Sequence, residues 1–159
     1  MPLVPLLAPL LLAACAGAPA VDPPAPPVPA VVHGEEAGRT PGERAAIVAA
    51  GQVGAPYRYG GHSPSGFDCS GLVSFAWAHA GRRLPRTTGA LWNALAPVGR
   101  DDLEVGDVLF FDIDGKVSHV GLYLGDGRFV HAPATGREVT IADLDAPYYR
   151  RAFRRGGRP

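Results

Sequence analysis

The feature that most constrains the fold is an abrupt change of composition near residue 40. Ten of the 17 prolines lie at or before Pro41, and Asp22 is the only charged side chain before Glu35. A proline-rich segment with so little to bury does not form a packed core. We therefore expect the folded structure to lie in residues 40–159, which at ~115 residues suffice for one hydrophobic core.

The first residues are typical of an export signal. Residues 3–14 form an uncharged apolar run, shorter than the ~20 residues that span a bilayer, and it contains Pro5 and Pro9. The step Leu12-Ala13-Ala14-Cys15 resembles a bacterial lipoprotein signal, in which the cysteine sulfur receives a lipid before cleavage. The alternative is an ordinary signal in which Cys15 is incidental.

These patterns divide the chain into three parts. We expect a signal peptide at 1–14, a lipidated Cys15 with a Pro/Ala-rich tether at 15–39, and a globular domain with a basic end at 40–159. Proline keeps the tether extended, as a polyproline-II-like spacer. A ligand for a proline-recognising groove is the alternative for this segment.

Within the globular part, helical patterns precede strand patterns. A capping box at Thr40-Pro41-Gly42-Glu43 opens the first helix, and Gly81 ends the second. The predicted helices cover residues 40–52, 69–79 and 87–95. The predicted strands cover residues 107–113, 118–124, 128–131 and 138–141. Helices followed by a sheet predict an α+β fold, not a doubly wound parallel sheet.

Cys69 is the candidate nucleophile. If Cys15 is lipidated, Cys69 has no partner within the chain, and it lies in Gly66-Phe67-Asp68-Cys69-Ser70-Gly71 where a helix begins. Free N–H groups and the helix dipole favour a thiolate at such a position, and Asp68 can cap the same turn. The alternatives are a buried structural cysteine, or a disulfide to Cys15 in an unlipidated form.

A thiolate nucleophile needs a base, and five histidines are available. His33 lies in the tether and His62 in a Gly/Ser/Pro loop. His79 lies ~15 Å along the helix from Cys69, where it favours the negative helix end. His119 and His131 remain as the candidates.

The hairpin between the two strands decides whether these histidines meet. If Gly125-Asp126-Gly127 is a three-residue loop, His131 lies diagonal to His119 on one face, at ~7–8 Å between backbones. A two-residue loop would place the histidines on opposite faces. The three-residue loop predicts the pairs Leu124–Arg128, Tyr123–Phe129 and Gly121–His131.

Six motifs follow one another along the globular part. They are Tyr57-Arg58-Tyr59-Gly60-Gly61, Asp68-Cys69-Ser70-Gly71, Leu84-Pro85-Arg86-Thr87, Glu104-Val105-Gly106-Asp107-Val108-Leu109-Phe110-Phe111, Ser118-His119-Val120-Gly121-Leu122-Tyr123 and Phe129-Val130-His131-Ala132. Taken together and in this order, they resemble the NlpC/P60 family of cell-wall cysteine peptidases, from about Thr40 to Phe153. Closest in layout are the short, single-domain outer-membrane lipoprotein endopeptidases of Gram-negative bacteria.

The resemblance implies a papain-like α+β core in which Cys69 is the nucleophile, His119 the base and His131 the orienting third residue. It also places the phenol of Tyr57 near the thiolate. Family members hydrolyse amides in the peptidoglycan stem or crosslink, often between D-glutamate and diaminopimelate. Tyr57 O–H and the backbone N–H of Cys69 are then candidate donors to the oxyanion.

Four residues are further candidates for substrate contact. Arg58 and Arg86 suit substrate carboxylates by charge and position, although both could equally be solvated surface arginines. Asp68 and Ser70 flank the nucleophile and are included for that reason.

Other functions remain open. Zinc held by Cys69, His119, His131 and Asp68 is one rival, although no HExxH or paired-cysteine spacing supports it, so we expect no metal and no cofactor. A non-catalytic wall-binding lipoprotein and an amidase or acyltransferase on the same fold are the others. Zero net charge argues against nucleic acid as a partner.

Partners and location follow from the lipid signal and the resemblance. We expect a monomer that acts on peptidoglycan and is lipid-anchored to the periplasmic face of the outer membrane. A regulatory protease or adaptor is a partner that the sequence leaves open. The basic end is either a solvated helix face or frayed tail, or a patch for lipid headgroups or wall carboxylates. It consists of Arg150, Arg151, Arg154, Arg155 and Arg158.

Overall fold

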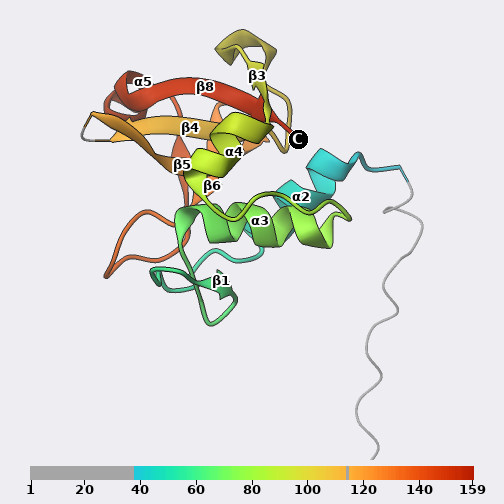
Figure 1. The fold of residues 1–159 in the computed structure, drawn as a ribbon, viewed down its shortest axis with the longest axis vertical. Helices are drawn as coiled ribbons and strands as arrows, with labels where there is room; N and C mark the ends of the chain where they lie inside the picture. The colour runs from blue at the N-terminus through green and yellow to red at the C-terminus, as the bar shows by residue number, and fades with distance from the viewer. Residues whose placement is uncertain (1–37, 114) are drawn as a thin grey trace, which may run out of the picture. The chain divides into compact units, whose positions relative to one another are not determined.

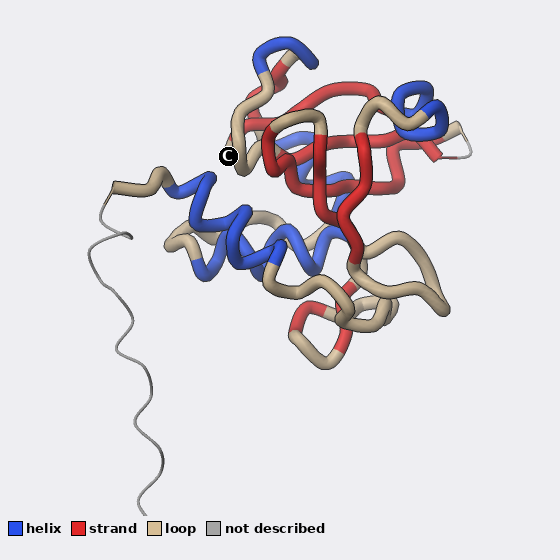
Figure 2. The backbone as a smooth tube through the Cα atoms, turned by 180° about the vertical axis from the view of Figure 1, so that it is seen from behind, coloured by secondary structure: helices blue, strands red, loops and turns tan. Residues whose placement is uncertain are grey.

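Helices pack against a six-stranded antiparallel sheet, most of them on one face (Figures 1 and 2). The computed structural model describes residues 38–113 and 115–159. The signal peptide, Cys15, His33 and all of the tether except Gly38 and Arg39 therefore lie outside the described residues. The expected α+β class is confirmed. None of the helices in the described ranges is long and apolar enough to cross a membrane.

Three of the helices were predicted close to their observed limits. They are α2 (Pro41–Ala50), α3 (Cys69–His79) and α4 (Thr88–Ala94). The predicted capping box at Thr40 is present, since Thr40 and Glu43 exchange side-chain-to-backbone hydrogen bonds. Helix α2 ends at Ala50, two residues before the predicted limit at Gln52. A short 3₁₀ helix, η1 (Arg100–Asp102), and α5 (Pro147–Ala152) were not predicted.

The main sheet has the strand order β3-β8-β4-β5-β6-β7. Its strands are β3 (Ala96–Val98), β4 (Val108–Ile113), β5 (Lys116–Gly125), β6 (Arg128–His131), β7 (Thr140–Asp143) and β8 (Phe153–Arg158). Strand β6 coincides with its prediction, whereas β7 begins two residues later than the predicted 138.

The sheet is covered by apolar side chains on both faces. On the helix side, Leu72 and Trp77 of α3 pack with Val120 and Leu122 of β5. This confirms that the even-numbered residues of β5 face the main core. On the opposite face Phe111 and Phe129 form a smaller cluster, against which α5 packs.

The β5–β6 hairpin differs from the predicted one, yet the histidines share a face. Tyr123 pairs with Phe129 as predicted, but Gly125 and not Leu124 pairs with Arg128. The loop is thus a two-residue turn, Asp126-Gly127, with positive φ at both positions, and Leu124 is an extra, bulged residue. The loop is one residue shorter than predicted, and the bulge adds one residue. The alternation of side chains before the bulge is therefore as predicted, with His119 and His131 on the same face.

The basic C-terminal end is a strand and not a frayed tail. Strand β8 lies between β3 and β4, and Arg154 pairs with Asp112 at 2.8 Å while Arg158 pairs with the buried Asp107 at 2.8 Å. The Arg155 guanidinium lies 3.9 Å from the ring centre of Trp92. Arg154, Arg155 and Arg158 therefore interact with other residues of the fold, which corrects the frayed-tail alternative, whereas Arg150 and Arg151 are exposed on α5.

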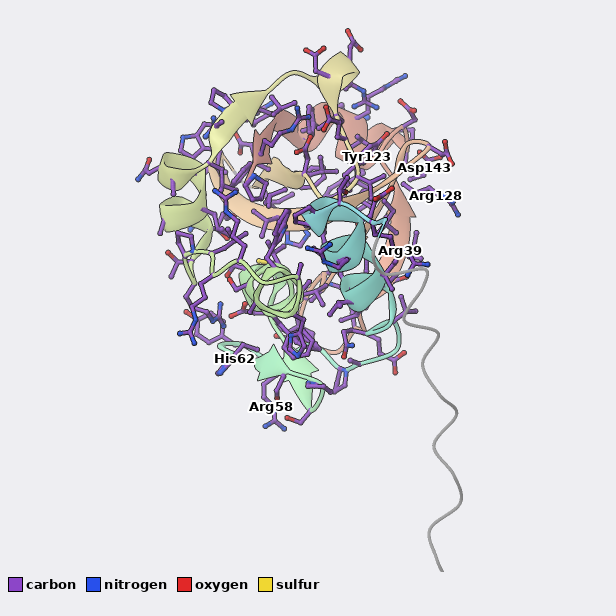
Figure 3. All side chains as sticks on the ribbon, turned by 90° about the vertical axis from the view of Figure 1, so that its right-hand side faces the viewer. Arg39, Arg58, His62, Tyr123, Arg128 and Asp143 are labelled. Carbon is purple, nitrogen blue, oxygen red and sulfur yellow. The ribbon has the colours of Figure 1, made fainter. Side chains whose placement is uncertain are left out.

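A small hairpin precedes α3. Strands β1 (His62–Ser63) and β2 (Gly66–Phe67) pair with each other and were not predicted. In Figure 3 the labelled side chains of Arg58 and His62 lie at this outer end of the molecule and point away from it. The hairpin leads directly into Asp68 and the start of α3.

Candidate active site

Cys69 is the first residue of α3. The carboxylate of the preceding residue, Asp68, accepts a 2.7 Å hydrogen bond from the Gly71 N–H and so caps the helix as predicted. The thiol is partly buried, with its sulfur 3.9 Å from Thr88 Oγ1 and 4.0 Å from the carbonyl oxygen of Ser118. The helix therefore points its N-terminal end at the beginning of the segment that carries His119.

Burial raises the pKa of the Cys69 thiol. Hydrogen bonds from the backbone of Val120, the Thr88 hydroxyl and the backbone of Ser70 act in the opposite direction, and the Asp68 charge adds to the rise. The neutral thiol is thus the resting form. This corrects the expectation that the helix start alone holds a thiolate, because loss of hydration outweighs the favourable N–H groups.

His119 and His131 form a hydrogen-bonded pair. Nε2 of His119 lies 2.8 Å from Nδ1 of His131, and the two side chains are 9% and 1% exposed. The prediction that the two imidazoles meet on one face of the hairpin is therefore confirmed. Nδ1 of His119 is left as the ring nitrogen that can serve the cleft.

Both imidazoles are neutral at physiological pH. Burial lowers the pKa of His119 to about 4. Burial, together with the charges of His119 and Arg137, lowers the pKa of His131 to about 3. The resting site thus holds a neutral thiol and a neutral imidazole, and we expect proton transfer to His119 to accompany attack by the sulfur.

Tyr149 of α5 completes this chain of polar groups, and sequence reasoning missed it. Its hydroxyl lies 3.3 Å from Nε2 of His131, and its ring packs against Phe111, Phe129 and His131. The only local signal was Pro147, which suits the first position of a helix. Nothing local to Tyr149 indicates that α5 folds back over the histidines.

The three groups determine which nitrogen is basic. For Nδ1 of His119 to accept a proton, its Nε2–H must donate to Nδ1 of His131. His131 then carries its hydrogen on Nε2 and donates it to the hydroxyl oxygen of Tyr149. In this arrangement His119 can take the thiol proton, and the imidazolium that forms keeps the same hydrogen bond to His131.

Tyr57 lines the same cleft as the Cys69 thiol. Its backbone N–H donates to the Arg137 carbonyl at 2.8 Å, and it forms a bridge with Phe67 at the base of the hairpin. Burial and the nearby Cys69 and Asp68 raise the pKa of its phenol. Tyr57 therefore keeps its proton and can donate to an oxygen that becomes negative beside Cys69.

Asp68 and Arg86 form a bidentate ion pair beside the nucleophile. The two guanidinium nitrogens lie 2.9 and 2.7 Å from the two carboxylate oxygens, and they also donate to Ser70 Oγ and the Gly61 carbonyl. Burial alone would raise the pKa of Asp68, but bonds from Arg86 and from the Gly71 and Gly60 N–H groups lower it below its usual value.

This network bears on the four candidate substrate contacts. The polar atoms of Asp68, Arg86 and Ser70 are engaged with one another, so the pair holds the hairpin, the start of α3 and the residue 86 segment together. All three also line the cleft, and their role as substrate contacts stays a prediction. Arg58 does not line the cleft; it is exposed at the hairpin (Figure 3).

Two adjoining hollows meet at the thiol. Both are lined by Tyr57, Cys69 and Ser118, and their volumes are about 480 and 490 Å³. The first also contains His119, His131, Pro133, Ala134, Arg137, Tyr148 and Tyr149, and the second contains Tyr59, Gly60, Asp68, Ser70, Arg86, Thr87 and Thr88. Cys69 thus lies in the middle of one cleft that can hold a chain on either side.

Three further hollows among the described residues contain neither cysteine nor histidine. Their volumes are about 500, 430 and 420 Å³, and the first lies at the opposite end of α3, beside Trp77 and Gly106. Among the residues with described side chains, no group of three His, Cys, Asp or Glu side chains could hold a metal ion.

A cysteine at a helix start, a histidine pair on the facing sheet and a cleft between them define a papain-like α+β domain. The chain belongs to the NlpC/P60 family, whose pattern it matches over residues 54–158. The family expected from the motifs is thereby confirmed.

Curated relatives have related names. The chain is 43% identical over 108 residues to murein DD-endopeptidase MepH of Escherichia coli K12. This match covers 64% of this chain and 40% of that protein. It is 40% identical over 100 residues to the gamma-D-glutamyl-L-lysine dipeptidyl-peptidase of Bacillus subtilis 168, covering 61% and 34%. The chain thus spans well under half the length of these relatives.

Solved structures share the fold. An NlpC/P60 family protein from Bacillus cereus ATCC 10987 superposes with a TM-score of 0.69 at 32% identity, over 74% of this chain and 39% of that one. NlpC2 from Trichomonas vaginalis gives a TM-score of 0.70 at 31% identity, over 76% and 48%. These matches confirm the papain-like NlpC/P60 fold.

Proposed function

We propose that this protein is a cysteine endopeptidase that hydrolyses an amide bond in the peptides of peptidoglycan. The observation that carries the proposal is the arrangement of Cys69 between two hollows, with the 2.8 Å His119–His131 pair lining one of them. Membership of the NlpC/P60 family and the names of the relatives support it.

The first half of the reaction forms a thioester. As the sulfur of Cys69 bonds to the amide carbon, the thiol proton moves to Nδ1 of His119 and the carbonyl electrons move to the oxygen. Tyr57 O–H and the Cys69 N–H donate to that oxygen. When the carbon–nitrogen bond breaks, the imidazolium returns the proton to the leaving amine, and the acyl group stays on sulfur.

The second half consumes water. His119 takes a proton from a water molecule while the water oxygen attacks the thioester carbon. The carbon–sulfur bond then breaks and the sulfur regains a proton from His119. The products are a carboxylic acid, a free amine and the original thiol. His131 and Tyr149 hold the ring of His119 throughout, without a change in their own charge.

The candidate bonds are the D-glutamyl-diaminopimelate bond of the stem and the bond to diaminopimelate in the crosslink. The relatives are named for two such chemistries, a murein DD-endopeptidase and a gamma-D-glutamyl-L-lysine dipeptidyl-peptidase. Both are amides whose leaving amine belongs to a diamino acid, so one cleft and one mechanism suit either.

The test is hydrolysis of defined muropeptides by the purified full chain, followed by mass spectrometry of the products. Cys69→Ala is the matched control, because that variant lacks only the proposed nucleophile and leaves Cys15 unchanged. We expect one new amine and one new acid with the parent chain and neither with the variant. Cleavage by both proteins, or by neither between about pH 5 and 8, would contradict the proposal.

We also propose that the chain is an exported lipoprotein, monomeric and anchored to the outer membrane through Cys15. The supporting observations are the apolar run at 3–14 and the Leu12-Ala13-Ala14-Cys15 step. Labelling of producing cells with radioactive palmitate should mark the parent chain and not the Cys15→Ser variant. Equal labelling of the two, or export with no label, would contradict it.

A further inference from the structure

The position of His119 orients the cleft. In the proposed mechanism this imidazole gives its proton to the leaving amine, so the leaving group must lie on the histidine side of Cys69. The hollow with His119, His131 and Tyr149 is therefore the leaving-group side. The hollow with Asp68 and Arg86 is the side that holds the acyl group.

The two sides carry different charge. On the acyl side, Asp68 and Arg86 neutralise each other through an ion pair of 2.7 Å. On the leaving-group side, Arg137 is the single charged side chain among the described lining residues, since both histidines are neutral. Its guanidinium makes no ion pair or hydrogen bond with any residue that the structure describes.

The backbone of Arg137 is held by two hydrogen bonds, while its side chain is exposed. Its backbone N–H donates to the Ala134 carbonyl at 3.1 Å, and its carbonyl accepts from the Tyr57 N–H at 2.8 Å. Its positive charge is close enough to lower the pKa of His131 and to oppose the rise in that of Tyr149. The cation thus lies near the histidine end of the cleft, with its donors available to a ligand.

We propose that Arg137 binds a carboxylate on the leaving-group residue of the substrate, so that the enzyme prefers diaminopimelate over lysine at that position. The inference rests on the proposed function and specifies its substrate. Diaminopimelate is lysine with a second carboxylate on its far end, and that carboxylate stays with the leaving group for either candidate bond. A guanidinium binds a carboxylate through two parallel hydrogen bonds, which suits this discrimination.

The experiment uses two pairs of peptides. The peptides of the first pair are L-Ala-γ-D-Glu–X, and the bond to be cleaved joins D-Glu to X. In the second pair the bond to be cleaved joins D-Ala to X. In each pair X is either meso-diaminopimelate or L-lysine. The full chain, Arg137→Gln and Arg137→Lys are compared by kcat/KM. Arg83→Gln is the matched control, because Arg83 is also exposed and lines neither hollow.

For the parent chain we expect diaminopimelate to be preferred by about tenfold or more. Arg137→Gln should remove most of that preference by lowering kcat/KM for the diaminopimelate peptide, while the lysine peptide changes by less than about threefold. The preference of Arg137→Lys for diaminopimelate should lie between those of the parent chain and Arg137→Gln. The preference of Arg83→Gln should match that of the parent chain. An equal loss on both peptides, or an unchanged preference in Arg137→Gln, would overturn the inference.

A binding measurement separates this inference from the proposed function. The same peptides are titrated by calorimetry into Cys69→Ala, with and without Arg137→Gln. Tighter binding of diaminopimelate that depends on Arg137 supports the carboxylate site even if the parent chain cleaves nothing, in which case only the peptidase assignment fails. Equal affinity for both peptides, or no binding of either, overturns the carboxylate site. The peptidase assignment is then tested separately, by the cleavage of the muropeptides.

Discussion

The two sides of the cleft around Cys69 are held by different kinds of interaction. On the acyl side, the bidentate Asp68–Arg86 pair and its hydrogen bonds join the hairpin, the start of α3 and the residue 86 segment. On the leaving-group side, two neutral histidines and Tyr149 lie among Phe111 and Phe129. The acyl side is thus stabilised by an ion pair, whereas the histidines of the leaving-group side are uncharged in the resting enzyme.

This difference predicts separate phenotypes. Changes on the acyl side should act mainly on folding stability, because its polar groups bind one another. Changes on the histidine side should act mainly on catalysis, because its polar groups define a base. The expectations below test that division.

His119→Ala should have the largest effect. Without the imidazole, no group in the cleft takes the thiol proton or gives it to the leaving amine, so we expect kcat to fall by about 10⁴-fold or more. The measurement is hydrolysis of a muropeptide by the full chain. His62→Ala, at the exposed hairpin, is the control and should keep the parent rate; a residual rate in His119→Ala within about tenfold of the parent would remove His119 from the mechanism.

Gly71→Ala tests the opposite side. A Cβ at this position would lie 2.0 Å from the Gly61 carbonyl oxygen and 2.9 Å from Asp68 Oδ1, where backbone and ion pair leave no room. We expect the free energy of unfolding in urea to fall by roughly 2–4 kcal/mol.

The matched control is Gly89→Ala in α4, since a Cβ there meets nothing within 4 Å. That change should leave stability unaltered or raise it by up to about 1 kcal/mol, because alanine favours helix. Equal stability of the two variants would mean that the Asp68–Arg86 network tolerates displacement and does not hold the acyl side.

Acid should weaken the two sides in different pH windows. The pKa values of His119 and His131 are lowered to about 4 and about 3 in the folded state, against ~6.5 unfolded, so the unfolded chain binds more protons between these values. Their contribution is complete above pH ~6.5 and is lost as pH falls toward 4 and 3. The pKa of Asp68 is also lowered, so its contribution is lost only below ~4.

Urea unfolding at pH 7.5 and 4.5 measures mainly the histidine window. We expect each of the two histidines to contribute on the order of 2 kcal/mol to the stability that the parent chain loses between these values. His131→Gln, which cannot titrate, should lose distinctly less, whereas Asp68→Asn should lose as much as the parent. A parent chain equally stable at both values would show that the histidine side is open to protonation.

Comparison of the two sides also explains what sequence could predict. The limits of α3 follow from neighbours in the chain, namely the cap at Asp68 and the glycine at Gly81, so local patterns suffice. Cys69, His119 and His131 were found for the same reason, because each lies in a short motif. The meeting of the histidines was predicted through a wrong loop, since no local rule indicated the bulge at Leu124.

The elements that sequence missed depend on distant partners. Strand β8 contains Gly156 and Gly157, which oppose a strand prediction, yet a Cβ on Gly157 would lie 2.7 Å from the Phe110 ring. The charges of Arg154 and Arg158 suggested a solvated surface because Asp112 and Asp107 are far away in sequence. Arg86 and Tyr149 each meet a partner 18 positions away, so neither contact can be inferred from its own neighbours.

Tyr149→Phe should have the smallest effect and gives the sharpest test of the histidine side. Without the hydroxyl, the Nε2–H of His131 has no acceptor among the surrounding aromatic rings, and the tautomer with hydrogen on Nδ1 becomes favoured. That hydrogen would then point at Nε2 of His119, whose own hydrogen would move to Nδ1. Nδ1 of His119 would then be unable to take the thiol proton, so we expect kcat to fall about tenfold with little change in KM.

Tyr123→Phe provides the matched control, because it removes a hydroxyl that accepts only the Gly127 N–H at 3.1 Å. Nitrogen NMR of the imidazoles should show hydrogen on Nε2 of both histidines in the parent chain and in Tyr123→Phe, with a shift toward Nδ1 in Tyr149→Phe. A merely structural role would lower stability and leave the tautomers unchanged. Unchanged tautomers with a normal kcat would limit the positioning chain to His119 and His131, and the aromatic side of the cleft would then act through packing alone.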